Sequence, residues 1–377
     1  MEKRVTLLAV LIGLFLALAA CAPAAAPPPT PTKAPAASPT VAAASTKPPA
    51  PASTPTVPAA TPTPRPATVK WGTLQAVSDV GLYVAIDKGY FKEQGITIDV
   101  NNVRSTAEAI PSLSTGQLDM MTGSLSQALI TAADRGIEFK IVAEKGQSIP
   151  KWETLWVVLR KDLADSGKVK TPADLKGLKI AFTTPGSVAD QIIQKMLEQA
   201  GLKRDDVEVI DLPIAEQAAA FGNKAIAAGF GYEPFIARGV QEGFSVKWLP
   251  SSSFFDGKLQ SSVIVFGPTL NKDADLARRV LIGYLKGARY YLKNFNTKDG
   301  RDEIVNILVK YTSVKDPKLF DVMEMPYADP NGQLDKKSVD AQYKFYVDKG
   351  LYTGKRSFSD ITDTSYLDYA VQVLGKQ

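Results

Sequence analysis

The fold is decided by residues 69–101, VKWGTLQAVSDVGLYVAIDKGYFKEQGITIDVN. Residues 69–74 predict a short strand, and residues 81–91 predict the helix that follows it. Residues 96–101 then alternate Ile96, Ile98 and Val100 with polar side chains, which is the period of a strand with one buried face. The stretch therefore predicts a strand–helix–strand unit, and the rest of the chain repeats this order.

The alternation leads to an apolar run at residues 154–160, TLWVVLR. Before it, helices are expected at residues 106–115 and 125–135, and strands at residues 118–122 and 139–144. The run itself suits a strand that is buried on both faces.

A second cycle follows, beginning with Thr171 and Pro172 at the cap and first position of a helical start. Strands are expected at residues 179–182, 207–212, 225–230 and 262–266, and helices at residues 188–200 and 215–221. The helix at 188–200 combines Ser187 as N-cap with one apolar stripe. Mainly helices come after it, at residues 274–295, 301–311, 338–349 and 364–374.

Alternating strands and helices predict α/β lobes, in which helices cover both faces of parallel sheets. The two cycles indicate two doubly wound α/β lobes joined by two crossings, at residues 154–160 and 262–266. Lobe 1 is expected to comprise residues 69–158 and 262–377, and lobe 2 residues 159–261. A ligand of such a fold lies in the cleft at the carboxyl ends of the strands.

The first 68 residues differ in composition from the rest. Residues 5–20 form an apolar run of 16 residues without a charge, shorter than the roughly 20 residues of a membrane-spanning helix. With the small residues that follow, the run predicts a signal peptide over residues 1–20. Residues 18–21, LAAC, resemble a bacterial lipoprotein signal, so we expect a lipid on Cys21. An ordinary export signal with a chance Cys is the alternative.

Residues 22–68 contain 15 Pro, 15 Ala and 9 Thr among 47 residues. Such a segment cannot build a core or a regular backbone ladder. Together with Cys21 it is therefore expected to be a disordered Pro/Ala/Thr tether over residues 21–68, between the membrane and the folded part.

The folded part is close to neutral. Of 44 Lys and Arg and 39 Asp and Glu, five basic residues and one acidic residue precede residue 69, which leaves a net charge of +1. Nucleic-acid binding needs a clustered basic surface and is not expected.

The chain has no His and one Cys. This excludes Ser-His-Asp and Cys-His catalysis, His-ligated metals, Cys-based zinc sites and intrachain disulfides. No metal, cofactor or catalytic residue is expected, although carboxylate, Lys or Tyr chemistry stays open.

Four motifs occur in one order along the chain: GLYVAIDKGYFKEQGI at residues 81–96, TGQLD at 115–119, DLKGLKIA at 174–181 followed by PGS at 185–187, and GYEPF at 231–235. They resemble the motifs of ABC-importer solute-binding proteins, in the branch that covers nitrate, sulfonates, thiamine-pyrimidine precursors and riboflavin. The resemblance extends from about residue 69 to 295. It implies a type II periplasmic-binding-protein-like fold, whose two lobes close on a ligand by hinge bending.

The resemblance also implies that helix N-termini face the cleft, where free N–H groups and the positive dipole end bind polar ligand atoms. The candidates at these termini are Gln75, Ser78, Asp79, Ser105, Thr106, Gly123, Ser124, Thr183, Thr184, Gly186 and Ser187. Plain N-capping is the alternative for each Ser and Thr. Asp79 stands where the thiamine-pyrimidine binders often carry a His, which counts against a pyrimidine held in the same way.

Three further candidates indicate a flat, neutral ligand. Trp152 and Tyr232 fall near the expected cleft, and flat rings stack on such side chains. Glu233 of the fourth motif would accept hydrogen bonds from ligand NH or OH groups and would repel a bare anion. The alternative is that Glu233 is an exposed charge on a turn. An anionic ligand would need a cation, for which Arg104 is the candidate unless it is a solvated surface residue.

The expected function is that of a lipid-anchored receptor on the extracytoplasmic face of the cell membrane. As a monomer it would bind riboflavin, or as second choice a thiamine-related pyrimidine, and deliver it to ABC permease and ATPase subunits. The first alternative is the same role for an aliphatic sulfonate or nitrate. The second is an enzyme, because fungal thiamine-pyrimidine synthases share this fold. Those enzymes consume an active-site His with a pyridoxal cofactor, and this chain has no His.

Overall fold

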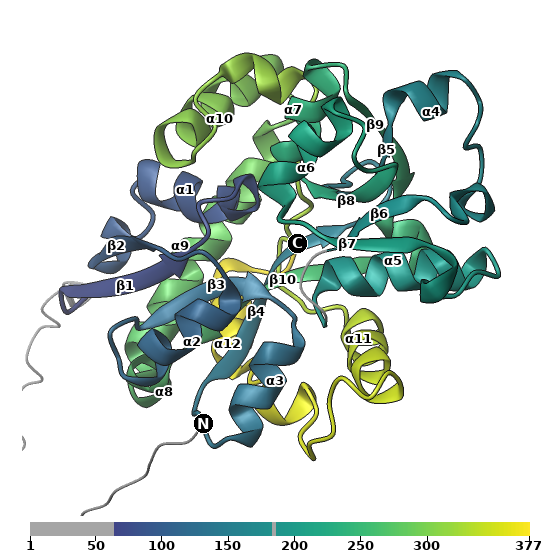
Figure 1. Ribbon diagram of the computed structural model, residues 1–377. Helices are drawn as coiled ribbons and strands as arrows, with labels where there is room; N and C mark the ends of the chain where they lie inside the picture. The colour runs from purple at the N-terminus through teal and green to yellow at the C-terminus, as the bar shows by residue number, and fades with distance from the viewer. Residues whose placement is uncertain (1–63, 183–185) are drawn as a thin grey trace, which may run out of the picture. The chain divides into compact units, whose positions relative to one another are not determined.

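The computed structural model describes residues 64–182 and 186–377 (Figure 1). The signal peptide, Cys21, most of the expected tether, Thr183 and Thr184 lie outside these residues. Strand β1 begins at Ala67, so residues 67 and 68 belong to the fold, and the expectation that the tether extends to residue 68 is wrong.

The described residues form two sheets of five strands each. The first has the order β2-β1-β3-β10-β4 and the second the order β7-β6-β8-β5-β9. The first consists of β1 (Ala67–Thr73), β2 (Ile96–Asn102), β3 (Met120–Ser124), β4 (Lys140–Ser148) and β10 (Leu259–Phe266). The second consists of β5 (Leu155–Arg160), β6 (Lys179–Phe182), β7 (Glu208–Asp211), β8 (Ala228–Tyr232) and β9 (Ser245–Pro250).

Helices follow the strands of both sheets. Those that accompany the first sheet are α1 (Val80–Asp87), α2 (Thr106–Ser114), α3 (Gln127–Asp134), α8 (Pro268–Lys272), α9 (Ala274–Asn294), α10 (Lys298–Tyr311), α11 (Lys336–Asp348) and α12 (Ser365–Leu374). Those of the second are α4 (Lys161–Asp165), α5 (Val188–Gln199), α6 (Ile214–Gly222) and α7 (Phe235–Gln241). Short 3-10 turns are η1 (Val77–Asp79), η2 (Lys92–Gln94), η3 (Pro172–Leu175), η4 (Arg204–Asp206), η5 (Ser251–Phe254), η6 (Pro317–Asp321) and η7 (Ser359–Ile361).

Strand β10 shows how the first sheet is buried on both faces. Ile264 and Phe266 pack into the core that contains Trp71 and residues of α1 and α9. Val263 and Val265 point the other way, into a core with residues of α2, α3 and α11. Successive side chains of a strand face opposite sides of the sheet, so a continuous apolar run is what this central position requires.

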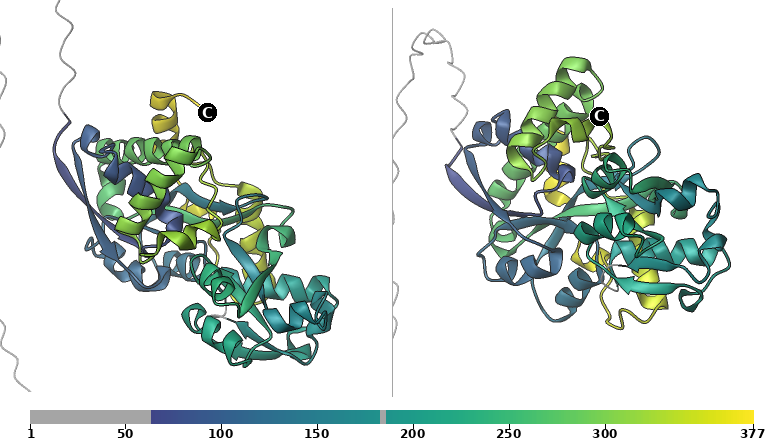
Figure 2. Two further views of the ribbon diagram at one scale, coloured as in Figure 1. Left: turned by 90° about the horizontal axis from the view of Figure 1, so that it is seen from above. Right: turned by 45° about the horizontal axis from the view of Figure 1, so that its top comes forward.

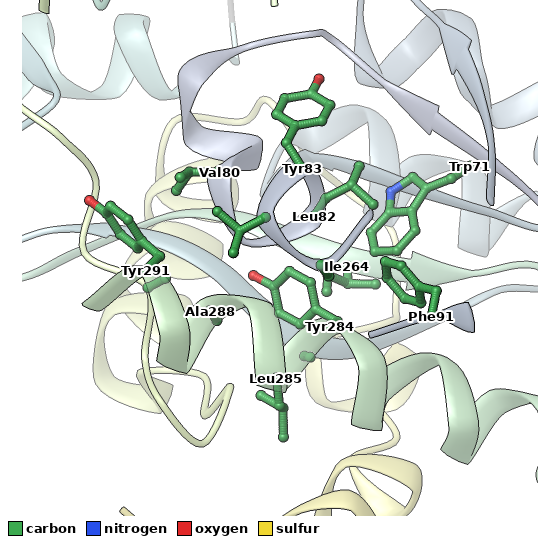
Figure 3. Packing of buried hydrophobic residues seen from close by; sticks show 14 of the residues in the cluster. Trp71, Val80, Leu82, Tyr83, Phe91, Ile264, Tyr284, Leu285, Ala288 and Tyr291 are labelled. Atoms are coloured by element: carbon green, nitrogen blue, oxygen red, sulfur yellow. The ribbon is translucent and has the colours of Figure 1, made fainter. Parts of the chain in front are cut away.

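The helix of the opening stretch packs closely against α9. Figure 3 shows Tyr284 and Ala288 of α9 facing α1, with Trp71 and Phe91 beside them. The approach depends on small residues, because a Cβ built on Gly287 would overlap the carbonyl oxygen of Gly81. Helix α1 ends at Asp87 rather than at the expected residue 91, and α9 and α10 lie beside it (Figure 2).

The second sheet also carries a core on each face. The apolar stripe of α5, which includes Ile192 and Met196, packs with Val157 and Leu159 of β5. Val158 lies in a separate core with residues of α6 and α7. The expected helix at 188–200 is thus confirmed, one residue shorter at its C-terminal end.

The fold class is confirmed, with two α/β lobes of the type II topology, but two details differ. Strand β10 runs antiparallel to β3 and β4, and β5 runs antiparallel to β8 and β9, so each sheet is mixed rather than parallel. Because β5 pairs within the second sheet, residues 155–158 lie there and not in lobe 1 as expected. The crossings are residues 149–154 and 251–258. None of the described helices is long and apolar enough to span a membrane.

Candidate functional site

A buried ion pair lies where β1 and β4 end. Asp79, in η1, has a side chain that is 0 % exposed, and its Oδ1 lies 3.0 Å from Nζ of Lys145, which is 2 % exposed. The Oγ1 of Thr73 donates to Asp79 Oδ2 at 2.5 Å, and Lys145 Nζ donates to Ser78 Oγ at 2.9 Å. Lys145 thus contacts two predicted site residues, Ser78 and Asp79, and sequence reasoning missed this cation. A lysine just after a run of apolar strand residues was the available signal.

Two neighbours complete this corner of the first lobe. The backbone N–H of Gln75 donates to Thr73 Oγ1 at 3.0 Å, and Gln75 itself has a left-handed φ of 51°. The ring of Tyr83 stacks on Tyr311 at 5.4 Å between centroids. Burial, and then the nearby Asp79 carboxylate, raise the pKa of the Tyr83 hydroxyl well above its ordinary value. Tyr83 therefore stays protonated and polar here.

The start of α2 meets the end of β3. The backbone N–H of Ser124 donates to Oγ1 of the buried Thr106 at 3.0 Å. A Cβ on Gly123 would lie 2.7 Å from that same Oγ1, so glycine is needed for the approach. Thr106, Gly123 and Ser124, three of the predicted ligand residues, therefore lie together. Their role in ligand binding stays a prediction. Ser105 is exposed and accepts from Glu108 N–H at 3.1 Å, which is an N-cap.

Arg104, the cation considered for an anionic ligand, lies on the surface. Its side chain is 90 % exposed, and its Nε lies 3.8 Å from Oε1 of Glu108. An ion pair this exposed contributes little to the stability of the fold. Arg104 is thus the solvated surface residue of the alternative interpretation.

The start of α5 lies where the two lobes meet. Gly186 has a φ of +75°, and a Cβ on it would contact Gln127 of α3 in the first lobe. Its N–H donates to Asp190 Oδ2 at 2.9 Å, while Asp190 N–H donates to the capping Ser187 Oγ at 3.2 Å. Asp190 also accepts from Arg204 NH1 at 3.1 Å. This carboxylate therefore occupies the positive end of α5.

Glu233 is buried, with 2 % exposure, so it is not an exposed charge on a turn. It precedes the cis peptide bond to Pro234. Its Oε2 accepts from Ala237 N–H at 3.0 Å, and its Oε1 lies 3.3 Å from Lys247 Nζ. Burial raises the pKa of Glu233, and Lys247 opposes that shift. Both carboxylate oxygens thus already have partners within the protein.

The two aromatic candidates differ in availability. Trp152 packs against Tyr291, Phe295 and Tyr327, with centroid distances of 6.0, 6.3 and 6.4 Å. Its ring therefore packs mainly with the core of the first lobe and is less available for stacking on a ligand. Tyr232 is 36 % exposed and contacts Phe235 edge-on at 5.3 Å, so its ring has a face available for stacking.

Charge is balanced throughout these clusters. Lys145, Lys247 and Arg204 each lie within 3.3 Å of a carboxylate oxygen, of Asp79, Glu233 and Asp190 respectively. Because each of these cations already faces a carboxylate, the clusters are better suited to hydrogen-bond a neutral ligand than to neutralise a charged one. In residues 64–182 and 186–377 no group of three His, Cys, Asp or Glu side chains is placed to hold a metal ion.

Two surface cavities lie away from these clusters. One of about 370 Å³ is bordered by residues of α11 and α12, and one of about 270 Å³ by residues of α4 and the end of α6. Neither is lined by a predicted ligand residue.

Residues 78–296 match the family described as NMT1/THI5 like. The chain belongs to the NMT1/THI5-like family. The match covers the same part of the chain as the resemblance drawn from the four motifs, which is thereby confirmed.

Curated relatives of this NMT1/THI5-like chain include an Escherichia coli (strain K12) protein named for binding aliphatic sulfonates, 30 % identical over 137 residues. That match covers 36 % of this chain and 40 % of the relative, so the chain spans less than half the length of that protein. A Brucella abortus (strain 2308) protein named only as a binding protein is 24 % identical over 243 residues, 61 % of this chain and 67 % of the relative.

Solved structures share the fold. The periplasmic aliphatic sulphonate binding protein of Escherichia coli has a TM-score of 0.64 at 17 % identity, covering 79 % of this chain and 92 % of its own. The periplasmic nitrate-binding protein of Synechocystis PCC 6803 has a TM-score of 0.65 at 16 % identity, covering 83 % and 90 %. A desulfurization enzyme has a TM-score of 0.60 at 12 % identity, covering 81 % and 99 %, so the fold serves enzymes as well as binding proteins.

Proposed function

We propose that the chain is the ligand receptor of an ABC importer, a protein that captures a small molecule between its two lobes and delivers it to a permease and its ATPase. Family membership and the two-lobed topology support this role. The expected lipid on Cys21 would hold the receptor at the extracytoplasmic face of the membrane. An enzyme of the thiamine-pyrimidine synthase type is disfavoured, because the chain has no His to consume.

The ligand we propose is a neutral, planar, hydrogen-bond-rich ring, with riboflavin first and a thiamine-related pyrimidine second. The observation that carries this choice is the charge pairing near the strand ends. A bare anion would meet Lys145 already paired with Asp79 and Lys247 already paired with Glu233. Tyr232 would stack on the ring, while Thr106, Ser124 and Ser187 would lie near its polar edge.

A small anion is the second candidate, and the relatives support it. Several solved structures of this fold and one curated relative are named for sulfonates or nitrate. An anion would bind at the backbone N–H groups of the α2 and α5 starts, where it would compete with Asp190.

A thermal-shift panel tests these alternatives. The full chain in detergent, stripped of ligand, is heated with riboflavin, a thiamine pyrimidine, an alkanesulfonate or nitrate. Ligand at about 100 times its dissociation constant stabilises the folded state by about 2.7 kcal/mol, a shift of about 4–10 °C for a chain of this size. We expect the shift with riboflavin. A shift with the anions alone would favour the second candidate.

Site variants show where the ligand binds. Thr106→Ala should reduce the riboflavin shift, because it removes the hydroxyl that links α2 to β3. Thr115→Ala is the matched control, since Thr115 caps the other end of α2 and is exposed. Equal loss in both variants would point to general destabilisation of α2 instead of a lost ligand contact.

A further inference from the structure

The part of the chain that follows the family match contacts the second lobe at two places. The match ends at residue 296, and the rest, residues 297–377, contains α10, α11 and α12. We call residues 297–377 the C-terminal strap. Helix α10 fastens it to the first lobe, where Lys310 Nζ donates to Asp87 of α1 at 2.7 Å.

The first contact of the strap with the second lobe comes directly after η6. Nζ of Lys247, on β9 of the second lobe, donates to Val322 O at 2.9 Å and lies 3.3 Å from Glu324 Oε1. The Glu324 N–H donates to Oε1 of the buried Glu233 at 3.4 Å. Residues 322–324 are thus held by the second lobe.

The next residues of the strap are held by the first lobe. Tyr291 of α9 donates its hydroxyl to Pro326 O at 2.7 Å. The N–H of Gln147, on β4, donates to Tyr327 O at 2.9 Å. Two to three residues of extended chain therefore connect contacts with opposite lobes.

The second contact of the strap with the second lobe is made by α11. Its middle is fixed to the first lobe, because Gln342 Nε2 donates to Gln260 O at 2.8 Å and the Tyr346 hydroxyl donates to Leu125 O at 3.2 Å. The residue that caps its C-terminal end, Lys349, pairs with Glu198 of α5 in the second lobe.

The N-terminal end of α11 makes a similar contact. Lys337 Nζ lies 2.8 Å from Asp256 Oδ2 in the second crossing. The neighbouring Phe254 and Phe255 pack in the core of the second lobe, so this contact also joins the strap to that lobe.

These contacts are charged, and those of α11 are largely exposed. The Lys337 and Asp256 side chains are 80 % and 79 % exposed. Exposed pairs are individually weak and are screened by salt, so they can form and break during hinge bending, unlike an apolar interface. The two pairs lie at opposite ends of α11, so both act on the distance between the lobes.

We propose that the C-terminal strap holds the second lobe against the first in the absence of ligand and so sets the fraction of closed molecules. The proposal rests on the proposed function in one respect, namely that closure of the lobes serves to capture a ligand. Its test needs no ligand, so its failure and that of the proposed function are separable.

The distance between the lobes can be measured by pulsed electron resonance on the full chain in detergent. Cys21→Ser removes the one native Cys, and Glu138→Cys and Lys168→Cys place one spin label on an exposed residue of each lobe. Distances are recorded without ligand at low and at high salt.

The variant Lys337→Glu/Lys349→Glu makes both ends of α11 repel the second lobe. It should raise the ratio of open to closed molecules about three- to tenfold at low salt, with a smaller effect at high salt. Reversing the partners as well, by Asp256→Lys and Glu198→Lys, should restore the parent distances. That rescue separates an ion-pair effect from misfolding.

The matched control is Lys336→Glu/Lys344→Glu. These lysines lie on the same helix, but their partners Asp340 and Asp348 are four residues away within α11. The control should leave the distance distribution unchanged. Identical distributions in Lys337→Glu/Lys349→Glu and the parent, or an equal shift in the control, would overturn the proposal.

Discussion

Lys145 Nζ lies 3.0 Å from Asp79 Oδ1, and neither side chain is more than 2 % exposed. The pair joins the end of β4 to the turn after β1, so it fixes the geometry of one corner of the candidate site. Because both charges have lost their water, each depends on the other.

Breaking this pair should be costly. Lys145→Met leaves Asp79 as an unpaired buried charge, and we expect the free energy of unfolding to fall by about 3–5 kcal/mol. Lys145→Met/Asp79→Asn should lose clearly less, because no charge is left behind. Urea unfolding measures both. A single variant that loses less than about 1 kcal/mol would show that the pair is not closed to water.

Glu144 should make stability depend on pH. Burial raises the pKa of this fully buried carboxyl well above its ordinary value, so the folded state binds its proton more tightly than the unfolded state does. The stabilisation from that proton is present below the unfolded pKa and is lost as pH rises through the folded pKa. Glu144→Gln keeps an acceptor for the N–H of Asp329 but does not titrate.

The measurement is the unfolding free energy of the parent and Glu144→Gln across a pH series. The parent should lose stability relative to the variant as pH rises. A constant difference between the two over the whole series would contradict the raised pKa.

Gly123→Ala tests the contact between β3 and α2. The new methyl would lie 2.7 Å from Thr106 Oγ1, and overpacking of this kind costs about 1–3 kcal/mol. In a Thr106→Ala background the same change should cost less, because the crowding hydroxyl is gone. Thermal unfolding of the four proteins gives this coupling, and strictly additive losses would argue against the close approach.

Gly287→Ala tests the packing of the opening helix. A Cβ there would overlap Gly81 O and Ala85, so α1 and α9 must separate at a cost of about 1–3 kcal/mol or more. Lys286→Ala, on the same helix but outside the α1 contact, should cost much less. Equal losses in the two variants would mean that α9 can shift without penalty.

Most of the fold was predictable because apolar runs and cap residues mark its elements. The helix after Ser187 and the strand around Val157 fall where the sequence puts them. Strand β9 was missed because its polar–apolar alternation covers only residues 245–248 and ends at Leu249 and Pro250. The assignment of β5 to a sheet could not be read from its sequence, since strand partners are chosen by contacts distant along the chain.

The site was harder to predict for the same reason. Asp79 was recognisable as a candidate, but its partner Lys145 lies 66 residues later, and sequence spacing does not show that they meet. Glu233 was predicted to present its carboxylate to a ligand. In the structure the carboxylate is buried, accepts from Ala237 N–H and pairs with Lys247. Its role in ligand binding stays a prediction.

Direct titration of the purified full chain by calorimetry, with riboflavin and with an alkanesulfonate side by side, tests the proposed ligand class most directly. We expect saturable heat with riboflavin and none with the sulfonate, because Lys145, Lys247 and Arg204 are each already paired with a carboxylate. Saturable binding of the sulfonate with no heat from riboflavin would contradict the neutral-ring assignment and establish an anion receptor.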